Sequence, residues 1–278
     1  MTKIISPMTN EELELLNALI SENFGLVFTE HKKQILESRL KPRLQQLKLN
    51  RFIDYYFFLQ TNKNNEYEQL SHLVTNNETY FFREAYHFDL LYSEAIDELK
   101  FNSSVPFKLR FLSAGCATGE EAYSLNIYAK ENQYQLWNYQ IEIDAFDIDS
   151  TCIEKAKSAI YKNHSLRFLT DEQKLKYFKK TDKDSYELKS IFKNGVIFFT
   201  GNLLELRTFY KPIPYDTIFC KNVLIYFSEA AIIKTINNLK NCLRRNGLLF
   251  LGHSESIIGL SNDFETIRLG NYIVYRRI

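Results

Sequence analysis

Apolar residues recur at intervals of three and four through the first 75 residues, which is the spacing of amphipathic helices. A first helix is predicted behind Thr9 or Asn10, either of which can cap it through a side-chain oxygen. Pro42 is expected to interrupt or kink a second helix, because proline cannot donate the backbone hydrogen bond. That helix places four leucines on one face, at Leu36, Leu40, Leu44 and Leu47. With further helices over about 51–60 and 65–74, residues 1–75 are predicted to form a small all-α domain.

From Lys108 onward, short apolar strands alternate with longer helical segments. This alternation indicates βαβ units and a mostly parallel sheet, hence an α/β domain. The strands are predicted at Leu109–Ser113, Ile141–Phe146, Val196–Thr200, Thr217–Cys220 and Leu248–Gly252, with a terminal hairpin at Phe264–Arg268 and Tyr272–Arg276. The helices are predicted at about 120–130, 150–159 and 229–243.

Two stretches depart from this alternation. Lys176–Lys180 and Tyr186–Lys189 flank a polar turn and predict a small antiparallel β insertion within about 176–195. Residues 76–107 are predicted to be a linker. The predicted organisation is therefore an all-α domain over 1–75 and an α/β domain over 76–278 that includes the linker and the insertion.

The composition argues against several classes of protein. A net charge of +1 disfavours a generic nucleic-acid binder, which normally carries a basic surplus. No apolar run approaches the roughly 20 residues that span a bilayer, and the N-terminus lacks the apolar core of a secretory signal. The four cysteines are dispersed, with neither a CxxC pair nor a histidine at ligand spacing, so reduced thiols and no metal site are expected. We therefore expect a cytoplasmic protein without direct membrane insertion.

The segment Gly115–Gly119 joins a predicted strand directly to a predicted helix. Glycines there let the backbone approach a ligand closely, and the helix N-terminus offers free N–H groups. The spacing is not the GxGxxG of dinucleotide sites, and Glu120 and Glu121 would be unfavourable beside a pyrophosphate. These carboxylates suit a ligand with an ammonium group and a sulfonium, such as S-adenosylmethionine. The alternative is a tight strand-to-helix turn that binds no ligand.

Two aspartates follow the second predicted strand. Asp147 is placed to accept hydrogen bonds from ribose hydroxyls, as an acidic residue at this strand end does in nucleoside sites. Asp149 is expected to cap the following helix. Together with the glycine loop, Asp147 favours a nucleoside cofactor without deciding its chemistry.

Six segments in this order and spacing resemble the CheR family of chemotaxis-receptor methyltransferases over nearly the whole chain. They are Asn77–Arg83 (NETYFFR), Ser113–Ser124 (SAGCATGEEAYS), Asp147–Asp149, Asn202–Leu204, Asp216–Phe227 (DTIFCKNVLIYF) and Leu251–Ser256 (LGHSES). The resemblance implies a Rossmann-like class I S-adenosylmethionine-dependent methyltransferase domain with a small β insertion. It also implies a preceding all-α domain that recognises the receptor, and S-adenosylhomocysteine as the product.

The resemblance further implies a set of cofactor contacts. Asn77, Thr79 and Arg83 enter the pocket, with the Arg83 guanidinium facing the cofactor carboxylate. One or both of the loop glutamates meet the methionine end, and the aspartate that ends the second strand meets the ribose. Asn202 and Leu203 match family residues that border the adenine. Asn222 and Val223 lie in the loop that closes over the cofactor in the family. Ser254 and Glu255 stay without an assigned role.

Tyr226 matches a family tyrosine near the transferred methyl group, so Tyr226 and Arg83 are the predicted catalytic residues. A glutamate with its usual pKa of about 4.3 is already ionised near pH 7, so methylating it needs alignment and not a general base. In the family, a basic helix of the all-α domain faces the acidic cytoplasmic helical domain of the receptor. The residues predicted to do so here are Lys32, Lys33, Arg39 and Arg43. The alternative for those residues is a solvated helix face. The turn Thr181–Ser185 lacks glycine, which favours a member that needs no receptor peptide tether.

The predicted activity is transfer of a methyl group from S-adenosylmethionine to receptor glutamates by a monomer. One alternative is a methyltransferase of the same fold that acts on a small molecule or RNA. Another is a non-catalytic module that binds S-adenosylmethionine or S-adenosylhomocysteine and signals through protein contacts. An NAD-dependent oxidoreductase is disfavoured by the spacing of the glycine loop.

Overall fold

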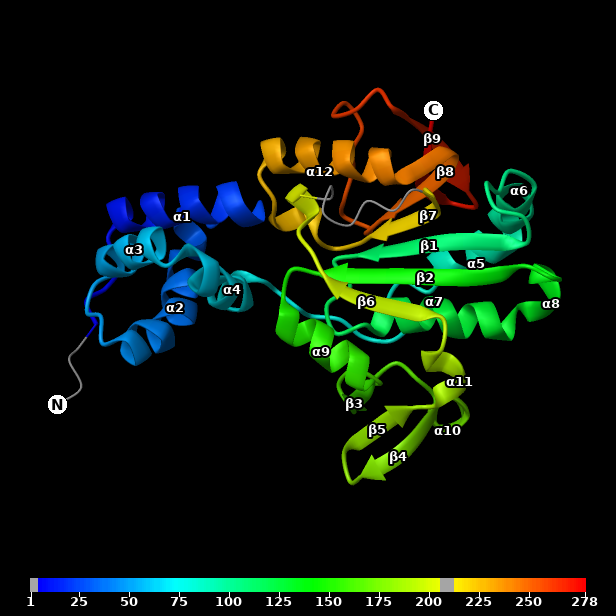
Figure 1. Ribbon diagram of the computed structural model, residues 1–278, viewed down its shortest axis with the longest axis horizontal. Coiled ribbons are helices and arrows are strands. Elements are labelled where there is room, and N and C mark those ends of the chain that lie inside the picture. The colour runs from blue at the N-terminus through cyan, green and yellow to red at the C-terminus, as the bar shows by residue number, and fades with distance from the viewer. Residues whose placement is uncertain (1–4, 206–212) are drawn as a thin grey trace. The chain divides into compact units, whose positions relative to one another are not determined.

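The computed structural model describes residues 5–205 and 213–278 (Figure 1). The chain forms two compact units, Met1–Asn76 with Tyr226–Lys234, and Asn77–Ile225 with Thr235–Ile278. We refer to the first as the helical unit and to the second as the sheet unit. Along the described ranges, no helix is both long and apolar enough to cross a membrane.

The helical unit contains α1 (Asn10–Phe24), the 3-10 turn η1 (Glu30–Lys32), α2 (Lys33–Leu47), α3 (Phe52–Thr61) and α4 (Lys63–Val74). Thr9 caps α1 in a reciprocal arrangement with Glu12. The Thr9 hydroxyl accepts the Glu12 N–H at 3.1 Å, and the Glu12 carboxylate accepts the Thr9 N–H at 2.8 Å. The predicted start of the first helix is confirmed, with Thr9 as the cap.

Helix α2 runs unbroken through Pro42, so the interruption expected there was wrong. Leu36, Leu40 and Leu44 are fully buried on one face, as their spacing predicted. Burying each leucine contributes about 1.5–3 kcal/mol. Three such side chains outweigh the loss of roughly 3 kcal/mol that an internal proline causes.

Residues Tyr226–Lys234 join the helical unit although they lie far from its helices along the chain. Leu26 and Phe227 form an isolated antiparallel bridge. Beside it, the Val27 N–H donates to the Tyr226 carbonyl at 2.9 Å. Backbone pairing therefore fixes the segment after Ile225 to the loop that follows α1.

The main sheet in the described residues has the strand order β6-β2-β1-β7-β8-β10-β9. The first five of these strands pair in parallel, and β10 runs antiparallel between β8 and β9. The bounds are β1 (Lys108–Ala114), β2 (Gln140–Asp147), β6 (Val196–Thr200), β7 (Tyr215–Cys220), β8 (Leu243–Leu251), β9 (Phe264–Leu269) and β10 (Tyr272–Arg277). The predicted strands and the terminal hairpin are confirmed. Strand order reverses between β1 and β7, and ligands bind beyond the carboxyl ends of strands at such a point.

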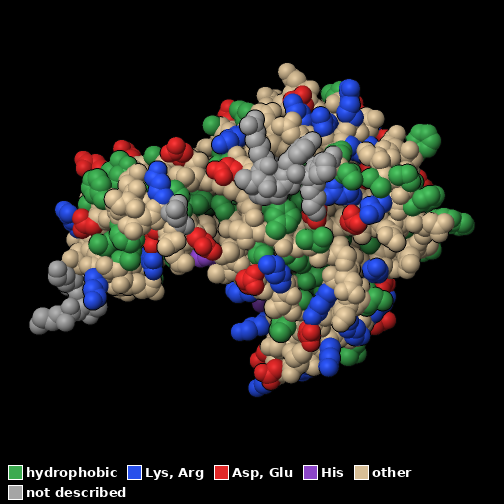
Figure 2. Space-filling view, in the orientation of Figure 1, with side chains coloured by type: hydrophobic (Ala, Val, Ile, Leu, Met, Phe, Trp, Pro, Cys, Tyr) green, Lys and Arg blue, Asp and Glu red, His purple; other side chains and the backbone are tan. Residues whose placement is uncertain are grey.

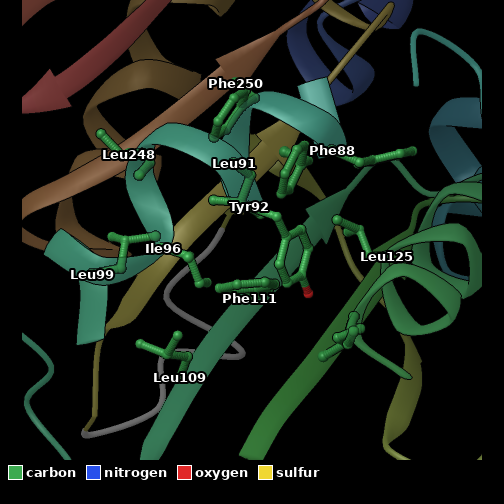
Figure 3. Packing of buried hydrophobic residues seen from close by; sticks show 14 of the residues in the cluster. Phe88, Leu91, Tyr92, Ile96, Leu99, Leu109, Phe111, Leu125, Leu248 and Phe250 are labelled. Atoms are coloured by element: carbon green, nitrogen blue, oxygen red, sulfur yellow. The ribbon is translucent and has the colours of Figure 1, made fainter. Parts of the chain in front are cut away.

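The helices that follow these strands are α7 (Glu120–Glu131), α8 (Gln133–Leu136), α9 (Ser150–Ser158) and α12 (Glu229–Cys242). Helix α7 contacts β1, β2 and β6. The stretch predicted as a linker also folds into helices, α5 (Tyr86–Leu90), the π-helical turn η2 (Leu91–Ala95) and α6 (Ile96–Phe101). Figure 3 shows Leu91, Tyr92 and Ile96 of this stretch packed near Phe111 of β1, within the main buried cluster. The prediction of a linker missed these helices.

The β insertion is a small antiparallel sheet with the order β3-β5-β4, formed by β3 (Ile160–Lys162), β4 (Phe178–Asp182) and β5 (Ser185–Leu188). Helices α10 (Asp171–Tyr177) and α11 (Ser190–Lys193) flank its last two strands. The predicted insertion is present, but β3 was missed because three residues are too short to show a period of two. The exposed side chains of the insertion include both signs of charge, at Lys179, Lys180, Asp182 and Lys183. Figure 2 shows lysine and arginine side chains mixed with acidic ones over the face in view.

Candidate functional site

The glycine loop lies between the end of β1 and the start of α7, against the loop that follows β7. Gly115 has φ of +79°, a left-handed conformation that favours glycine. Its N–H and that of Cys116 both donate to the Phe146 carbonyl at 2.9 Å, which ties the loop to β2. A Cβ atom on Gly115 would lie 2.6 Å from Cγ2 of Val223. The structure therefore brings together Gly115 and Val223, two residues predicted to contact the cofactor.

Asp147 ends β2 with its side chain buried beneath the glycine loop. Its carboxylate accepts the Ala117 N–H at 2.8 Å and the Asp149 N–H at 3.0 Å. Burial raises the pKa of Asp147 to about 6, although these N–H donors favour the ionised form. Asp147 is thus an acidic group at the expected strand end, held in place by the loop that it supports.

Asp149 caps α9, as predicted from its position. Its carboxylate accepts the N–H groups of Thr151 and Cys152 at 2.9 and 3.2 Å. It also accepts the side-chain amide of Asn77 at 2.7 Å. Asn77, a predicted pocket residue, is therefore anchored to the helix cap beside Asp147.

The two glutamates in the first turn of α7, directly after the glycine loop, have different surroundings. Glu120 is buried, and its carboxylate accepts the hydroxyls of Thr118 and Ser165 at 2.7 and 2.8 Å. Burial raises the pKa of Glu120. Glu121 accepts the hydroxyl of Ser113 at 2.8 Å, at the end of β1. Both glutamates therefore have partners within the protein, and Glu121 is the one that lies beside the end of β1, with its other oxygen 3.4 Å from the Lys221 ammonium.

Lys221 is a buried cation that sequence reasoning did not single out. Its ammonium lies 3.4 Å from both Glu84 and Glu121 and donates to the Arg83 carbonyl at 3.0 Å. Lys221 thereby links the segment before α5 to the glycine loop. The one sequence signal was its place directly before Asn222 within the matched segment after β7.

Arg83 and Thr79 lie in the segment before α5, and both are partly buried. The Arg83 guanidinium donates to the Glu78 carbonyl at 3.0 Å and lies 5.8 Å from the centre of the Tyr80 ring. This hydrogen bond and the contact with the Tyr80 ring hold the guanidinium within its own segment. They leave further N–H groups of the fork for a carboxylate, because arginine carries five donors.

Asn202 and Leu203 follow β6, which pairs with β2 beside Asp147. The Asn202 side-chain oxygen accepts the Leu204 N–H at 2.9 Å. Leu203 is buried, and its carbonyl accepts the side-chain amide of Asn238 at 2.9 Å. The strand order therefore places both predicted adenine contacts on the β6 side of Asp147.

Tyr226 belongs to the helical unit and borders a pocket of about 150 Å³ there. Its hydroxyl accepts the side-chain amide of Asn76 at 2.7 Å, and the Lys32 ammonium lies 5.8 Å from its ring centre. The residues that line the pocket are Leu26, Val27, Phe28, Lys32, Ile35, Arg39, Val74, Asn76 and Tyr226. Two of the predicted receptor-binding cations therefore lie beside Tyr226.

The other two predicted receptor-binding cations do not line this pocket. Arg43 forms two hydrogen bonds with the buried carboxylate of Glu66, at 2.8 and 2.6 Å. Lys33 donates to the side-chain oxygen of Asn10 at 2.7 Å. Arg39 does line the pocket, although its guanidinium also donates to the carbonyls of Val74 and Thr75.

All four cysteines are free and buried. Burial raises the pKa of Cys116 well above its usual value, so this thiol stays protonated. Within residues 5–205 and 213–278, no group of histidine, cysteine and acidic side chains is arranged to hold a metal ion.

The fold and the loop define the class of protein. The domain is a Rossmann-like class I methyltransferase domain. Its sheet is parallel except for β10, a glycine turn follows β1, and an acidic residue ends β2. The residues present fit S-adenosylmethionine. A Cβ atom would clash at Gly115, and two carboxylates that could accept hydrogen bonds from an ammonium group and from hydroxyls, Glu121 and Asp147, lie next to the glycine loop.

Comparison with known proteins identifies the family. The CheR methyltransferase SAM-binding domain matches residues 77–273, and the CheR methyltransferase all-alpha domain matches residues 11–75. The chain therefore belongs to the CheR methyltransferase family, as its six segments predicted.

Named relatives cover most of the chain. A chemotaxis protein methyltransferase of Borreliella burgdorferi is 35% identical, over 92% of this chain and 91% of its own length. Those of Salmonella typhimurium and Escherichia coli are 34% and 32% identical, over 88% and 92% of this chain and 84% and 88% of their own lengths.

Proposed function

We propose that this protein transfers methyl groups from S-adenosylmethionine to glutamate side chains of chemotaxis receptors, forming methyl esters. The observation that carries the proposal is the match to both CheR domains, from residue 11 to residue 273, by a chain whose relatives are named chemotaxis protein methyltransferases. The substrate class also agrees with the site, because a carboxylate nucleophile needs alignment and no general base.

The chain's own residues account for cofactor binding. Asp147 accepts the ribose hydroxyls, and one or both of Glu120 and Glu121 meet the ammonium group. Arg83 meets the cofactor carboxylate with its remaining donors. The other contacts are Asn77, Thr79, Gly115, Asn202, Leu203, Asn222 and Val223.

When bound, S-adenosylmethionine supplies an electrophilic methyl group on its sulfonium. Tyr226 orients the acceptor carboxylate by a hydrogen bond from its hydroxyl, whose oxygen Asn76 already holds. No residue has to remove a proton, since the glutamate carboxylate is ionised near neutral pH. The protein's contribution is then position and exclusion of water, which can supply roughly 7–11 kcal/mol of the barrier.

Lys32 and Arg39 are proposed to guide an acidic helical segment of the receptor to the helical unit. Both line the pocket beside Tyr226, and no acidic side chain is among the residues that line it. Exposed charges are screened over about 8–10 Å at physiological salt. Receptor binding that does not weaken as salt rises would remove this part of the proposal.

Replacing Tyr226 by phenylalanine is expected to lower turnover roughly 10- to 100-fold while S-adenosylhomocysteine affinity stays unchanged, because one hydrogen bond to a charged acceptor is lost. The assay follows methyl-labelled cofactor into receptor cytoplasmic fragments and its release as methanol in mild base. Tyr134→Phe is the matched control, because Tyr134 is exposed and its ring lies outside both sites. Equal losses of turnover and affinity would show that Tyr226 only lines the pocket and does not orient the acceptor carboxylate.

The same assay tests the proposed chemistry. Label that mild base does not release would contradict carboxyl methylation. Absence of label in every receptor fragment, with S-adenosylhomocysteine binding intact, would favour a non-catalytic module.

Affinity for S-adenosylhomocysteine is expected to fall as pH drops through about 6, the pKa of buried Asp147. Burial raises this pKa, so the ionised form that accepts ribose hydroxyls is present above that pH and is lost below it. At one pH unit below the pKa, roughly a tenth of Asp147 is ionised, so binding should weaken about tenfold. Asp147→Asn should bind weakly at every pH, without this dependence. Calorimetry between pH 5 and 8 measures both affinities. If the affinity of Asp147→Asn fell with pH as steeply as that of the original chain, Asp147 would not be the source of the pH dependence.

A further inference from the structure

One partly buried carboxylate in the sheet unit accepts backbone N–H groups from two separate loops. Its two oxygens accept five donors, four of them from consecutive residues after β7 and one from the end of β8. Oε1 of Glu255 accepts the N–H groups of Val223 (2.8 Å), Leu224 (2.7 Å) and Ile225 (3.3 Å), and Oε2 accepts those of Asn222 (2.8 Å) and Gly252 (2.7 Å).

Consecutive N–H groups point to one centre only when the backbone takes an unusual conformation. Asn222 has φ of +61°, and the 3-10 turn η4 (Leu224–Tyr226) begins two residues later. Such a turn forms a concave site for an anion. In this chain the anion is the Glu255 side chain, so the carboxylate holds the loop in a conformation that most residues avoid.

The neighbouring Gly252 makes this approach possible. A Cβ atom on Gly252 would lie 2.7 Å from the Asn222 side-chain nitrogen and 2.8 Å from Oε2 of Glu255. The end of β8 and the loop after β7 are therefore in direct contact, with the carboxylate between them.

The clamped loop forms a wall of the candidate cofactor site. Val223 packs over Gly115 so closely that a Cβ on the glycine would lie 2.6 Å from Cγ2 of Val223. Two of the five hydrogen bonds to Glu255 come from Asn222 and Val223 themselves. Glu255 thus sets the distance between this wall and the glycine loop without being one of the proposed cofactor contacts.

We propose that Glu255 is a positioning residue, whose carboxylate fixes residues Asn222–Ile225 in the conformation that binds the cofactor. This assignment rests on the SAM-binding domain and is independent of which acceptor the enzyme methylates. Its tests therefore use S-adenosylhomocysteine alone, so that a failure of the receptor–glutamate proposal leaves them interpretable.

The first test is Glu255→Gln in the full chain. Glutamine keeps the shape but offers one acceptor oxygen, and its NH₂ group faces N–H groups that it cannot accept. Amide exchange at residues 222–225 is expected to accelerate about tenfold or more, while β1 keeps its protection. S-adenosylhomocysteine affinity, measured by calorimetry, is expected to fall about tenfold or more.

Two further variants separate the clamp from its surroundings. Glu94→Gln is the matched control, because the exposed Glu94 accepts a single N–H, that of Gly270, at 3.0 Å. It should leave affinity and loop exchange unchanged. Val223→Ala should weaken S-adenosylhomocysteine binding but leave exchange at Leu224 and Ile225 as in the original chain.

Two results would overturn the proposal. Unchanged affinity in Glu255→Gln, whatever the exchange of the loop, would show that the clamp does not serve the cofactor. If amide exchange in β1 of Glu255→Gln also became faster, the substitution would have lowered the stability of the whole unit and not the position of this loop alone. If Glu255→Gln does not fold, the same measurements on Glu255→Asp decide, because aspartate keeps the charge but is one methylene too short to reach both loops.

Discussion

Replacing Asp216 by alanine is expected to lower the free energy of unfolding of the sheet unit by about 3–5 kcal/mol. Asp216 is buried in β7, where one oxygen accepts Nε of Arg244 at 2.6 Å and the other accepts the Arg110 N–H at 2.8 Å. The Arg244 side chain is only 5% exposed. Removing the carboxylate would therefore leave a buried guanidinium without its counter-charge.

Urea unfolding of the original chain and the variant measures this loss. Glu154→Ala is the matched control, because Glu154 pairs with Lys157 at 2.9 Å and both side chains are more than half exposed. Such exposed pairs contribute at most about 1 kcal/mol. A loss below about 1 kcal/mol for Asp216→Ala as well would mean that Arg244 finds another acceptor or reaches water.

Replacing Gly115 by alanine is expected to weaken S-adenosylhomocysteine binding about 10- to 100-fold, which corresponds to about 1.4–2.8 kcal/mol. The left-handed backbone at Gly115, with φ of +79°, is strained for any other residue. The new methyl group would also lie 2.6 Å from Val223, so the glycine loop and the loop after β7 must move apart. Both loops carry proposed cofactor contacts, and calorimetry measures the effect.

Gly259→Ala separates backbone strain from the clash. Gly259 also has a left-handed φ, of +81°, but a Cβ there would meet nothing within 4 Å. This control should cost about 1 kcal/mol of stability and leave the affinity unchanged. If Gly115→Ala bound S-adenosylhomocysteine as tightly as the original chain, the contact between Gly115 and Val223 would have no part in the cofactor site.

Much of the fold could be predicted because its signals are local. Leu36, Leu40 and Leu44 recur at helical spacing and share a buried face. The Thr9 cap and the Asp149 cap each involve residues three or fewer positions away, so a short window contains the whole interaction. The glycine loop and Asp147 were found for the same reason, since each stands at the end of a recognisable apolar strand.

The errors arose where burial or pairing decides the structure. α5, η2 and α6 carry Leu91, Tyr92 and Ile96, which are buried by the sheet, yet the segment was predicted to be a linker. Ile160–Lys162 becomes a strand only because it pairs with β5. Pro42 stays inside α2 because the leucines on either side of it are buried.

The sequence by itself determined the class of fold, the family and the residues from which a cofactor site is proposed, because these depend on local patterns and their order. Only the tertiary structure decided how those residues are supported. Lys221 lies between Glu84 and Glu121, and Glu255 holds a loop that begins 33 positions earlier in the chain. No pattern of spacing predicts such pairs. A buried charge takes whichever partner the folded backbone brings within hydrogen-bonding distance.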